Sequence, residues 1–481
     1  MDKKNIRVER DYLGSVELSD DVLYGIHAWR AKENFGTNEP FPIEWYKAMG
    51  MVKQAYYELY QKYYEAVQQK YPEHLGKLKS PEKFSYLISA AQEVVQGKWF
   101  DHFIVPAIQG GAGTSINMNI NEIITNRALI LAGHKPGEYQ YIDPIEDANI
   151  YQSTNDTVPT ALKIALMILL EKLEHSINHL RAFCEEKEKT YRNVLRIGYT
   201  QLQEAVPSTW GLYFSSMSDA LSRDWWRVSK AFERIKVVNA GGGAIGTGVT
   251  IPTYFIMNLP DKLREISKQP VARGENLTDA TANWDSLVEV HAILKALAVN
   301  LEKFANDLRF FASDFHGQHI LKIPAKQVGS SIMPGKINPV ISEYVISMAQ
   351  KVQANDALIS QLAARGHAEL NPFLPLMGSA AIQSLKLLSE ACLSLANHLL
   401  KDLTIETETS YQRVLHSPVS TTLLIPYIGY NKAAELALLM KNEKINIIEA
   451  NRKLQLLDEN KLISLLEPAQ VVKLGFSIKE L

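Results

Sequence analysis

The sequence predicts a mainly α-helical protein of three domains, built around a central bundle of five long helices. Three observations support this prediction. Apolar residues recur at helical spacing over unusually long stretches in the middle of the chain. These stretches are apolar on more than one face, so they must bury that surface against partners. Glycine and proline interrupt the regions on either side. The predicted domains are residues 1–150, 151–402 and 403–481.

The first bundle helix is expected to begin at Pro159, because proline suits a first helical turn and Asp156 or Thr157 can cap it. Its apolar repeat continues to about Leu195. Broad apolar faces also indicate packing against other subunits, since a monomer would expose large apolar patches. The other four bundle helices are expected at residues 210–238, 284–312, 340–364 and 374–401.

The flanking domains are expected to hold shorter helices. In the first domain these cover residues 43–70 and 81–96, and a glycine-rich turn at 109–113 then leads into a helix start at Thr114. The last domain is punctuated by proline and glycine, which predicts a compact group of short helices. These begin near Asn431, Ile445 and Asp458.

Composition excludes several functional classes. The 481 residues carry a net charge of −2, so there is no basic excess for nucleic acid or a membrane surface. Cys184 and Cys392 form no metal-spaced pair and are expected to be reduced, buried thiols. Residues 1–5 lack the apolar core of a signal peptide, and the apolar stretch 161–170 is too short to span a bilayer. We therefore predict a cytoplasmic protein.

The segment Gly329–Glu343 has an unusual layout: two serines follow a glycine, and a lysine and an asparagine follow Pro-Gly. Its prolines and glycines exclude a helix or strand interior, which predicts a mobile loop that ends at a helix start. Asn338 suits the N-cap and Pro339 the first helical position. Lys336 and Asn338 can grip a carboxylate together. A serine among backbone N–H groups can lose its proton if those groups stabilise the alkoxide. Taken alone, the segment also fits a polar surface loop.

Two other polar stretches precede helices. Thr114 and Ser115 follow a glycine turn, and a helix start offers free N–H groups and a positive dipole end to a carboxylate. Residues 152–156, Gln-Ser-Thr-Asn-Asp, stand before the first bundle helix. In both places the small polar side chains can either bind an anion or only cap the helix.

These stretches resemble the motifs of the aspartase/fumarase superfamily. Residues 329–338 resemble its signature loop, G-S-S-x-M-P-x-K-x-N, without a break. Residues 113–119 are similar to its G-T-S-x-N-M-N segment, 152–156 to its Q-S-[ST]-N-D segment, and 198–207 to its third segment. Further matches extend the resemblance over nearly the whole chain, at residues 23–35, where aspartases are closer than fumarases, and at 424–430.

The resemblance implies an enzyme that abstracts a proton beside a carboxylate and expels an amine or hydroxide. Ser330, as alkoxide, would take the proton, and the resulting enediolate would be stabilised by hydrogen-bond donors. Asn155 and Gln201 would contact the leaving nitrogen. The family also implies a homotetramer whose sites combine different subunits, and neither a metal nor an organic cofactor. The implied substrate-binding residues are Thr114, Ser115, Asn117, Ser153, Thr154, Asn155, Thr200, Gln201, Ser331, Lys336 and Asn338.

Two departures bear on the substrate. Tyr199 replaces the usual arginine, and Gln201 stands where fumarases carry a histidine. Hydroxide needs a proton donor to leave, which histidine supplies and glutamine cannot, whereas an ammonium group already carries its proton. The sequence therefore favours elimination of ammonia from L-aspartate to give fumarate. Glu343, which partners that histidine in fumarases, has no assigned role.

Other functions stay open. Residues 313–316, Ser-Asp-Phe-His, replace the Ser-Gly-Pro-Arg of relatives, and together with Tyr199 and Trp210 they would suit a pocket for a bulkier amine. The alternatives are thus a lyase for another amino acid or an N-substituted aspartate, and then a fumarase. A non-catalytic structural protein, like the lens crystallins that resemble argininosuccinate lyase, is a different class, and the intact signature loop argues against it.

Two weaker signals favour no function of their own. Residues 241–246 fit G-x-G-x-x-G, but no strand is expected before them and no helix follows at once, so a dinucleotide site is not favoured. This stretch resembles the family's inter-helix G-T-G segment. His175 and His179 lie one helical turn apart without a third ligand, which indicates a solvated helix face.

Overall fold

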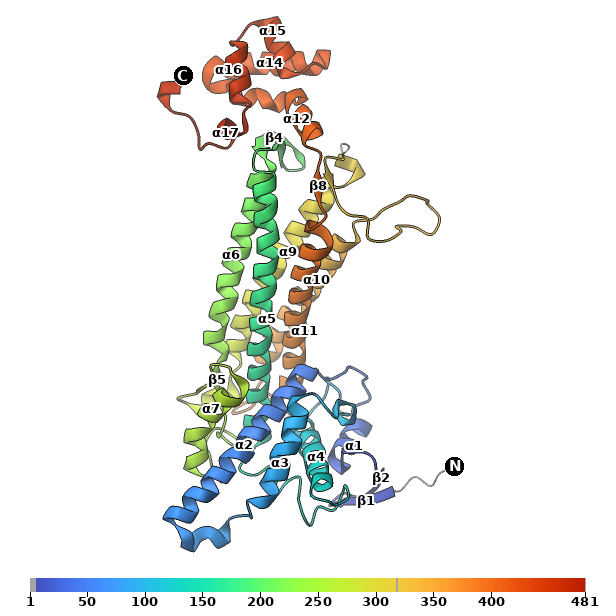
Figure 1. Ribbon diagram of the computed structural model, residues 1–481, viewed down its shortest axis with the longest axis vertical. Helices are drawn as coiled ribbons and strands as arrows, with labels where there is room; N and C mark the ends of the chain where they lie inside the picture. Colours follow the sequence, from blue (N-terminus) through green and yellow to red (C-terminus); the bar gives the residue numbers. More distant parts are fainter. Residues whose placement is uncertain (1–5, 317–318, 481) are drawn as a thin grey trace. The chain divides into compact units, whose positions relative to one another are not determined.

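The computed structural model describes residues 6–316 and 319–480 and is mainly helical, as predicted (Figure 1). Residues 1–5, used for the localisation prediction, lie outside the described residues. The chain divides into two compact units, each made of three segments. Unit 1 comprises Met1–Leu173, Arg227–Lys295 and Lys351–Leu387, and unit 2 comprises Glu174–Trp226, Ala296–Gln350 and Leu388–Leu481. The division into three domains stays a prediction.

The five long helices are present, and each contributes residues to both units. Their observed bounds lie close to the expected ones, except at the ends discussed below. A π-helical segment, η4 (Leu395–Leu400), continues the last of them. They are labelled in Figure 1 as α5 (Thr154–Thr190), α6 (Trp210–Ile235), α9 (Asp285–Phe311), α10 (Val340–Ala363) and α11 (Leu374–Ser394).

The start of α5 differs from the prediction, because the helix begins five residues before Pro159 and places this proline inside it. Proline has no N–H to donate to the carbonyl four residues earlier, that of Asn155. The Asn239 side chain supplies the missing donor, with Nδ2 2.8 Å from Asn155 O. A side chain distant in sequence therefore makes the early start possible. The helix also ends before Leu195, where an antiparallel hairpin, β3 (Leu195–Thr200) and β4 (Gln203–Thr209), begins.

Over its described residues, the rest of unit 1 consists of a second group of helices and four short strands. The two helices expected before residue 100 are confirmed, and they pack through stacked rings of Tyr60 and Phe84, whose centroids are 4.0 Å apart. The expected helix start at Thr114 is also confirmed. The helices are α1 (Ile26–Asn34), α2 (Ile43–Lys70), α3 (Glu82–Val95), α4 (Thr114–Leu131), α7 (Thr253–Ser267) and α8 (Leu277–Ala282), with short turns η1 (Pro72–Lys77) and η2 (Phe100–His102). The strands are the antiparallel β1 (Ile6–Asp11) and β2 (Gly14–Ser19), and the parallel β5 (Val237–Val238) and β6 (Ala272–Arg273).

The glycine-rich turn at 241–246 lies in unit 1. A short strand, β5, does precede it, which the sequence had not indicated, but α7 begins only at Thr253. A Cβ on Gly246 would lie 2.2 Å from the backbone nitrogen of Thr278. The glycine therefore allows close packing against α8, and the turn lacks the strand–turn–helix layout of a dinucleotide site.

Unit 2 contains the remaining parts of the long helices and the short helices of the chain's last segment. The hairpin β3–β4 packs against these short helices, with Leu195, Leu436 and Ile447 in one apolar core. Cys184 and Cys392 are buried free thiols, as expected, and burial raises the pKa of both well above the usual range. The remaining elements are η3 (Asp314–His316), β7 (Leu321–Lys322) paired antiparallel with β8 (Thr404–Ile405), α12 (Thr407–His416), η5 (Pro418–Leu424), α13 (Ile425–Ile428), α14 (Tyr430–Glu443), α15 (Ile447–Leu454), α16 (Glu459–Leu465), α17 (Pro468–Val471) and η6 (Ile478–Glu480).

Over residues 6–316 and 319–480, every helix falls short of the length and hydropathy that a bilayer span requires.

Candidate active site

The predicted site residues divide equally between the two units. Those of unit 1, here called the amino-terminal half-site, are Thr114, Ser115, Asn117, Ser153, Thr154 and Asn155. Those of unit 2, the carboxy-terminal half-site, are Thr200, Gln201, Ser330, Ser331, Lys336 and Asn338.

The amino-terminal half-site is formed by the starts of α4 and α5. Gly113 has a φ of +94°, and a Cβ there would lie 3.0 Å from a methyl carbon of Val158. Glycine thus lets the chain turn into α4 while that turn stays close to the first turns of α5. The first N–H groups of a helix lack intrahelical acceptors and stand at the positive end of its dipole. Two such ends in one region suit an anion.

Ser153 combines capping with a free donor. Its Oγ accepts a hydrogen bond from the backbone N–H of Asn155 at 3.2 Å, so it does cap α5. Its own N–H donates to Asp156 Oδ1 at 3.0 Å, and Asp156 Oδ2 accepts from Gly243 N at 3.0 Å. Burial raises the pKa of Asp156 to about 7, and its backbone donors oppose this. Because an accepting hydroxyl keeps its proton, Ser153 can still donate to a bound anion.

The amide of Asn155 has a fixed orientation. Its Nδ2 donates to the carbonyl oxygen of Ala244 at 2.8 Å, within the glycine-rich turn. Within the described part of the chain, Oδ1 has no hydrogen-bond partner. The hydrogen bond to the glycine-rich turn therefore leaves Oδ1 as a free acceptor at this site, to which an ammonium group can donate.

Asn117 lies in the interior, and its side chain is engaged by neighbours. Oδ1 accepts from Lys53 Nζ at 2.7 Å and Nδ2 donates to Asn149 Oδ1 at 2.9 Å. Direct contact of Asn117 with substrate stays a prediction. Lys53 was not predicted from the sequence, although a lysine one turn from both Met49 and Tyr57, on the buried face of α2, is an available signal.

The signature loop, residues 329–338, folds onto itself around Ser330. The Ser330 Oγ accepts hydrogen bonds from the backbone N–H groups of Ile332 at 3.1 Å and Met333 at 3.0 Å. Gly329 N donates to Lys336 O at 2.9 Å, and a Cβ on Gly329 would lie 2.6 Å from that oxygen. Two backbone donors aimed at one hydroxyl oxygen are the arrangement that stabilises an alkoxide.

The end of this loop corrects one prediction. Asn338 lies two residues before the start of α10, outside its N-cap position, and its Nδ2 donates to Gly329 O at 2.8 Å. The helix α10 begins at Val340, one residue after the expected Pro339. The asparagine thus closes the base of the loop instead.

Thr200 and Gln201 lie at the tip of the β3–β4 hairpin and are exposed. Gln201 and Leu202 both have positive φ, of 53° and 62°, as a tight two-residue hairpin turn requires. The turn therefore places Gln201 at the tip of the hairpin, directly after Thr200, the last residue of β3.

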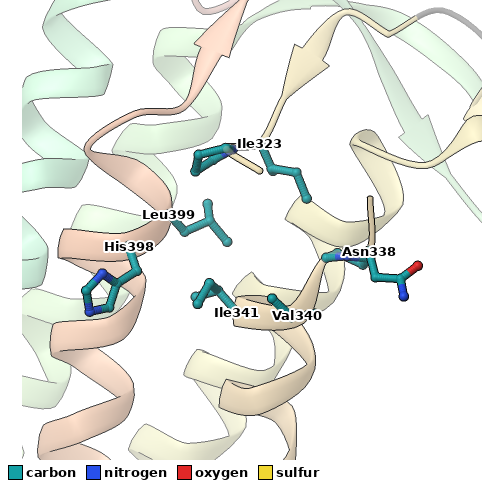
Figure 2. Close-up of a pocket in the computed structure, with 8 residues that line it drawn as sticks. Ile323, Asn338, Val340, Ile341, His398 and Leu399 are labelled. Carbon is teal, nitrogen blue, oxygen red and sulfur yellow. The ribbon is translucent and has the colours of Figure 1, made fainter. Parts of the chain in front are cut away.

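A small apolar cavity underlies the base of the signature loop. Figure 2 shows Ile323, Ile341 and Leu399 pointing toward its centre, whereas the amide of Asn338 points away from them. The cavity measures about 10 Å³, which is room for at most one water molecule. It lies at the carboxy-terminal end of the loop, at Asn338, and is too small for a substrate.

A larger cavity of about 920 Å³ lies beside the loop in unit 2. Lys336 and Asn338 line it together with Ser313, Asp314 and Phe315. The first three residues of the substituted Ser-Asp-Phe-His stretch therefore lie next to predicted substrate-binding residues.

Trp210 does not contribute to that cavity. It is buried, donates from Nε1 to Ser410 Oγ at 3.0 Å, and has the Arg196 guanidinium 4.6 Å from its ring centroid. Tyr199 packs edge-on against Phe310, with ring centroids 5.9 Å apart. The idea that Trp210 marks an amine pocket is wrong, because this residue belongs to the core.

His179 and Glu343, two residues left without a role by the sequence, have defined surroundings in the structure. The His179 ring nitrogen Nε2 lies 2.8 Å from Asn397 Oδ1, and among the described residues no three His, Cys, Asp or Glu side chains are grouped to hold a metal. Glu343 is exposed and also lines the larger cavity.

Comparisons with known proteins agree with the motifs. A family model described as "Lyase" matches residues 14–354, and one described as "Fumarase C C-terminus" matches residues 421–473. An aspartate ammonia-lyase of Bacillus subtilis is 37% identical over 440 residues, covering 90% of this chain and 89% of that protein. One of Escherichia coli strain K12 is 38% identical over 432 residues, covering 89% and 88%.

Solved structures show the same architecture. The cobalt-bound structure titled "fumarate lyase:delta crystallin" from Brucella melitensis superposes with a TM-score of 0.90 at 34% identity, covering 98% of this chain and all of that one. A class II fumarase from Schistosoma mansoni gives a TM-score of 0.85 at 26% identity, covering 96% of this chain and 98% of that one. The predicted fold class, a mainly α lyase, is thereby confirmed.

Proposed function

Since the chain belongs to the aspartase/fumarase superfamily of lyases, we propose that it is an aspartate ammonia-lyase, which converts L-aspartate to fumarate and ammonia. Relatives with that name match nine-tenths of the chain, which supports a carbon–nitrogen lyase over a structural protein. The reaction is a reversible anti-elimination. It needs a base for a very weak carbon acid, donors for the enediolate, and a place for the departing amine.

The geometry at Ser330 is the observation that carries the proposal. A serine hydroxyl is too weak an acid to act as a base unless its anion is stabilised. The N–H groups of Ile332 and Met333 already point at Oγ, so the charge of the alkoxide develops against preorganised donors. Ser330 then takes the proton from the carbon beside the substrate carboxylate, and the alkoxide becomes a neutral hydroxyl.

The two carboxylates of aspartate have separate receptors in this scheme. The amino-terminal half-site receives the one that becomes the enediolate, through hydroxyls of Thr114, Ser153 and Thr154 beside two helix starts. Lys336 and Asn338 hold the other from the signature loop, where Ser331 adds its N–H and hydroxyl. Together the two receptors favour substrates that carry two carboxylates.

The leaving group is an ammonium nitrogen. The free Oδ1 of Asn155 accepts from it, and the exposed amide of Gln201 offers a second acceptor. Neither residue can supply a proton to a departing hydroxide, which makes fumarase the weaker alternative.

We infer that the enzyme is a cytoplasmic homotetramer with shared sites. The family resemblance assigns the three motif stretches to different subunits. Apolar side chains on the long helices support association, since Val299 of α9 is 50% exposed and Trp226 of α6 is 59% exposed in the single chain. Such surface is normally covered by a partner.

A second candidate is a lyase for an N-substituted aspartate. The cavity of about 920 Å³ beside Lys336 and Asn338 is larger than aspartate needs, and Phe315 adds apolar surface to it. This cavity gives a bulkier amine a place to lie.

One assay separates these functions. The purified protein is incubated with L-aspartate, argininosuccinate (an N-substituted aspartate) or L-malate, and fumarate is followed by its ultraviolet absorbance. Highest kcat/KM with L-aspartate is expected. Preference for argininosuccinate would select the second candidate, and preference for malate, or no fumarate from any of the three, would overturn the proposal.

A further inference from the structure

The ammonium group of Lys53 lies among three amide oxygens in unit 1, in a fully buried position on α2. Nζ donates to Asn117 Oδ1 at 2.7 Å, to Gln152 Oε1 at 2.7 Å and to Asn149 Oδ1 at 3.4 Å. Each ammonium N–H therefore has an acceptor. Among the described residues, no carboxylate forms an ion pair with Lys53.

A buried cation held only by neutral amides is an expensive way to stabilise a fold. Burial lowers the pKa of Lys53 to about 7, and the nearby Asp156 opposes this. An apolar side chain of similar volume would fill the space without that cost. Buried charges of this kind concentrate at functional sites, where geometry matters more than stability.

The three amides link the two halves of the helix-start region. Asn117 is in the first turn of α4, three residues after Thr114, and Gln152 directly precedes Ser153. Asn149 joins them, because its Oδ1 also accepts from Asn117 Nδ2 at 2.9 Å. The network is thus continuous from the start of α4 to the start of α5.

We propose that Lys53 is the positioning residue of the amino-terminal half-site, which it sets by binding Asn117 and Gln152 at once. This inference rests on the proposed function, since that function makes the starts of α4 and α5 the carboxylate receptor. Lys53 does not touch substrate. It fixes the spacing between Thr114 on one side and Ser153 and Thr154 on the other, so that both sets of donors reach the same carboxylate.

The test compares Lys53→Met with a matched control, Lys163→Met. Lys163 is a second buried lysine of unit 1, with a pKa that burial lowers to about 8. Its Nζ donates to Val237 O at 2.7 Å and lies 5.4 Å from the Trp284 ring centroid, outside the amide network. Both substitutions remove one buried ammonium group and keep a long, unbranched side chain. Size-exclusion chromatography and thermal unfolding check that both variants assemble.

Two readouts are needed, kcat and KM for L-aspartate and the Kd of succinate by calorimetry. A misplacement of about 1 Å costs on the order of 10²-fold in rate, so kcat of Lys53→Met should fall by roughly 10²-fold. The KM for L-aspartate and the Kd of succinate should both rise. Lys163→Met should keep all three. A merely structural loss would reduce the active fraction, lowering kcat while KM and Kd stay unchanged.

Equal effects of the two variants, or an unchanged KM and Kd in Lys53→Met, would overturn the inference. If Lys53→Met does not fold, Gln152→Met replaces it, because this half-buried side chain can be changed while Lys53 keeps two acceptors. Wild-type kinetics from Gln152→Met would then be the contradicting result. Succinate binding requires no turnover, so a wild type that binds succinate without consuming aspartate refutes the proposed function and leaves the Lys53 test in place.

Discussion

Replacing Ser330 by alanine tests the base directly. The change removes one oxygen that accepts two backbone hydrogen bonds, at 3.1 and 3.0 Å. The donors, on Ile332 and Met333, belong to exposed residues, so water can replace the lost acceptor. Ser330→Ala should therefore leave the thermal unfolding temperature unchanged.

The expected kinetic loss follows from the same two bonds. A hydrogen bond to a charged acceptor contributes about 1.5–3 kcal/mol and one to a neutral acceptor about 0.5–1.5 kcal/mol. Two such bonds then favour the alkoxide over the hydroxyl by roughly 2–3 kcal/mol, or about 30- to 150-fold. Losing the base altogether removes more, roughly 10²- to 10⁴-fold in kcat.

Fumarate absorbance under saturating L-aspartate measures this loss. Ser331→Ala is the matched control, because it removes the neighbouring hydroxyl but keeps the backbone N–H, and it should cost about tenfold, the value of one ordinary hydrogen bond. Ser330→Ala activity above a tenth of wild type would mean that another group is the base. So would a larger loss in the Ser331 variant than in the Ser330 variant.

Three further changes probe other parts of the site. Lys336→Ala should raise KM and lower kcat, since a lost charged hydrogen bond costs about 1.5–3 kcal/mol, and an unchanged KM would place this lysine outside the site. Thr200→Ala and Ser330→Ala, each inactive, should regain activity after joint unfolding and refolding if sites are shared between subunits; exchanged tetramers that stay inactive would mean that each site lies within one chain. Asn239→Leu leaves the half-buried Asn155 carbonyl without its donor, at about 1–3 kcal/mol, so the unfolding temperature of the variant should fall. A wild-type melting curve for that variant would show that the hydrogen bond from Asn239 to Asn155 is not needed for the early start of α5.

The sequence was sufficient for the long helices, because a repeated apolar spacing is local information. It failed at Pro159, where the helix depends on a hydrogen bond from Asn239, eighty-four positions beyond Asn155. It also failed at Asn338, whose side chain closes a loop instead of capping a helix. Both cases show a local preference overruled by a partner that no spacing rule identifies.

The site shows the same division. The signature motif identifies Ser330, but only the structure reveals which two N–H groups donate to its oxygen. Trp210 was grouped with Tyr199 and residues 313–316 as a pocket for a bulkier amine, yet its surroundings are those of a core residue. Lys53 carried no motif at all, and its three amide partners come from distant positions.

The composition of unit 1 from three separate segments has a consequence for protein synthesis. All residues of its amino-terminal half-site have been synthesised once residue 155 is added, but the unit's last segment ends at Leu387. The ribosome must add 232 more residues (387 minus 155) before that unit has all its parts. At about 5–20 residues per second this takes roughly 10–50 s. During that interval the apolar faces of α2 and α5 emerge without their later partners, so nascent chains should be clients of chaperones that shield such surfaces.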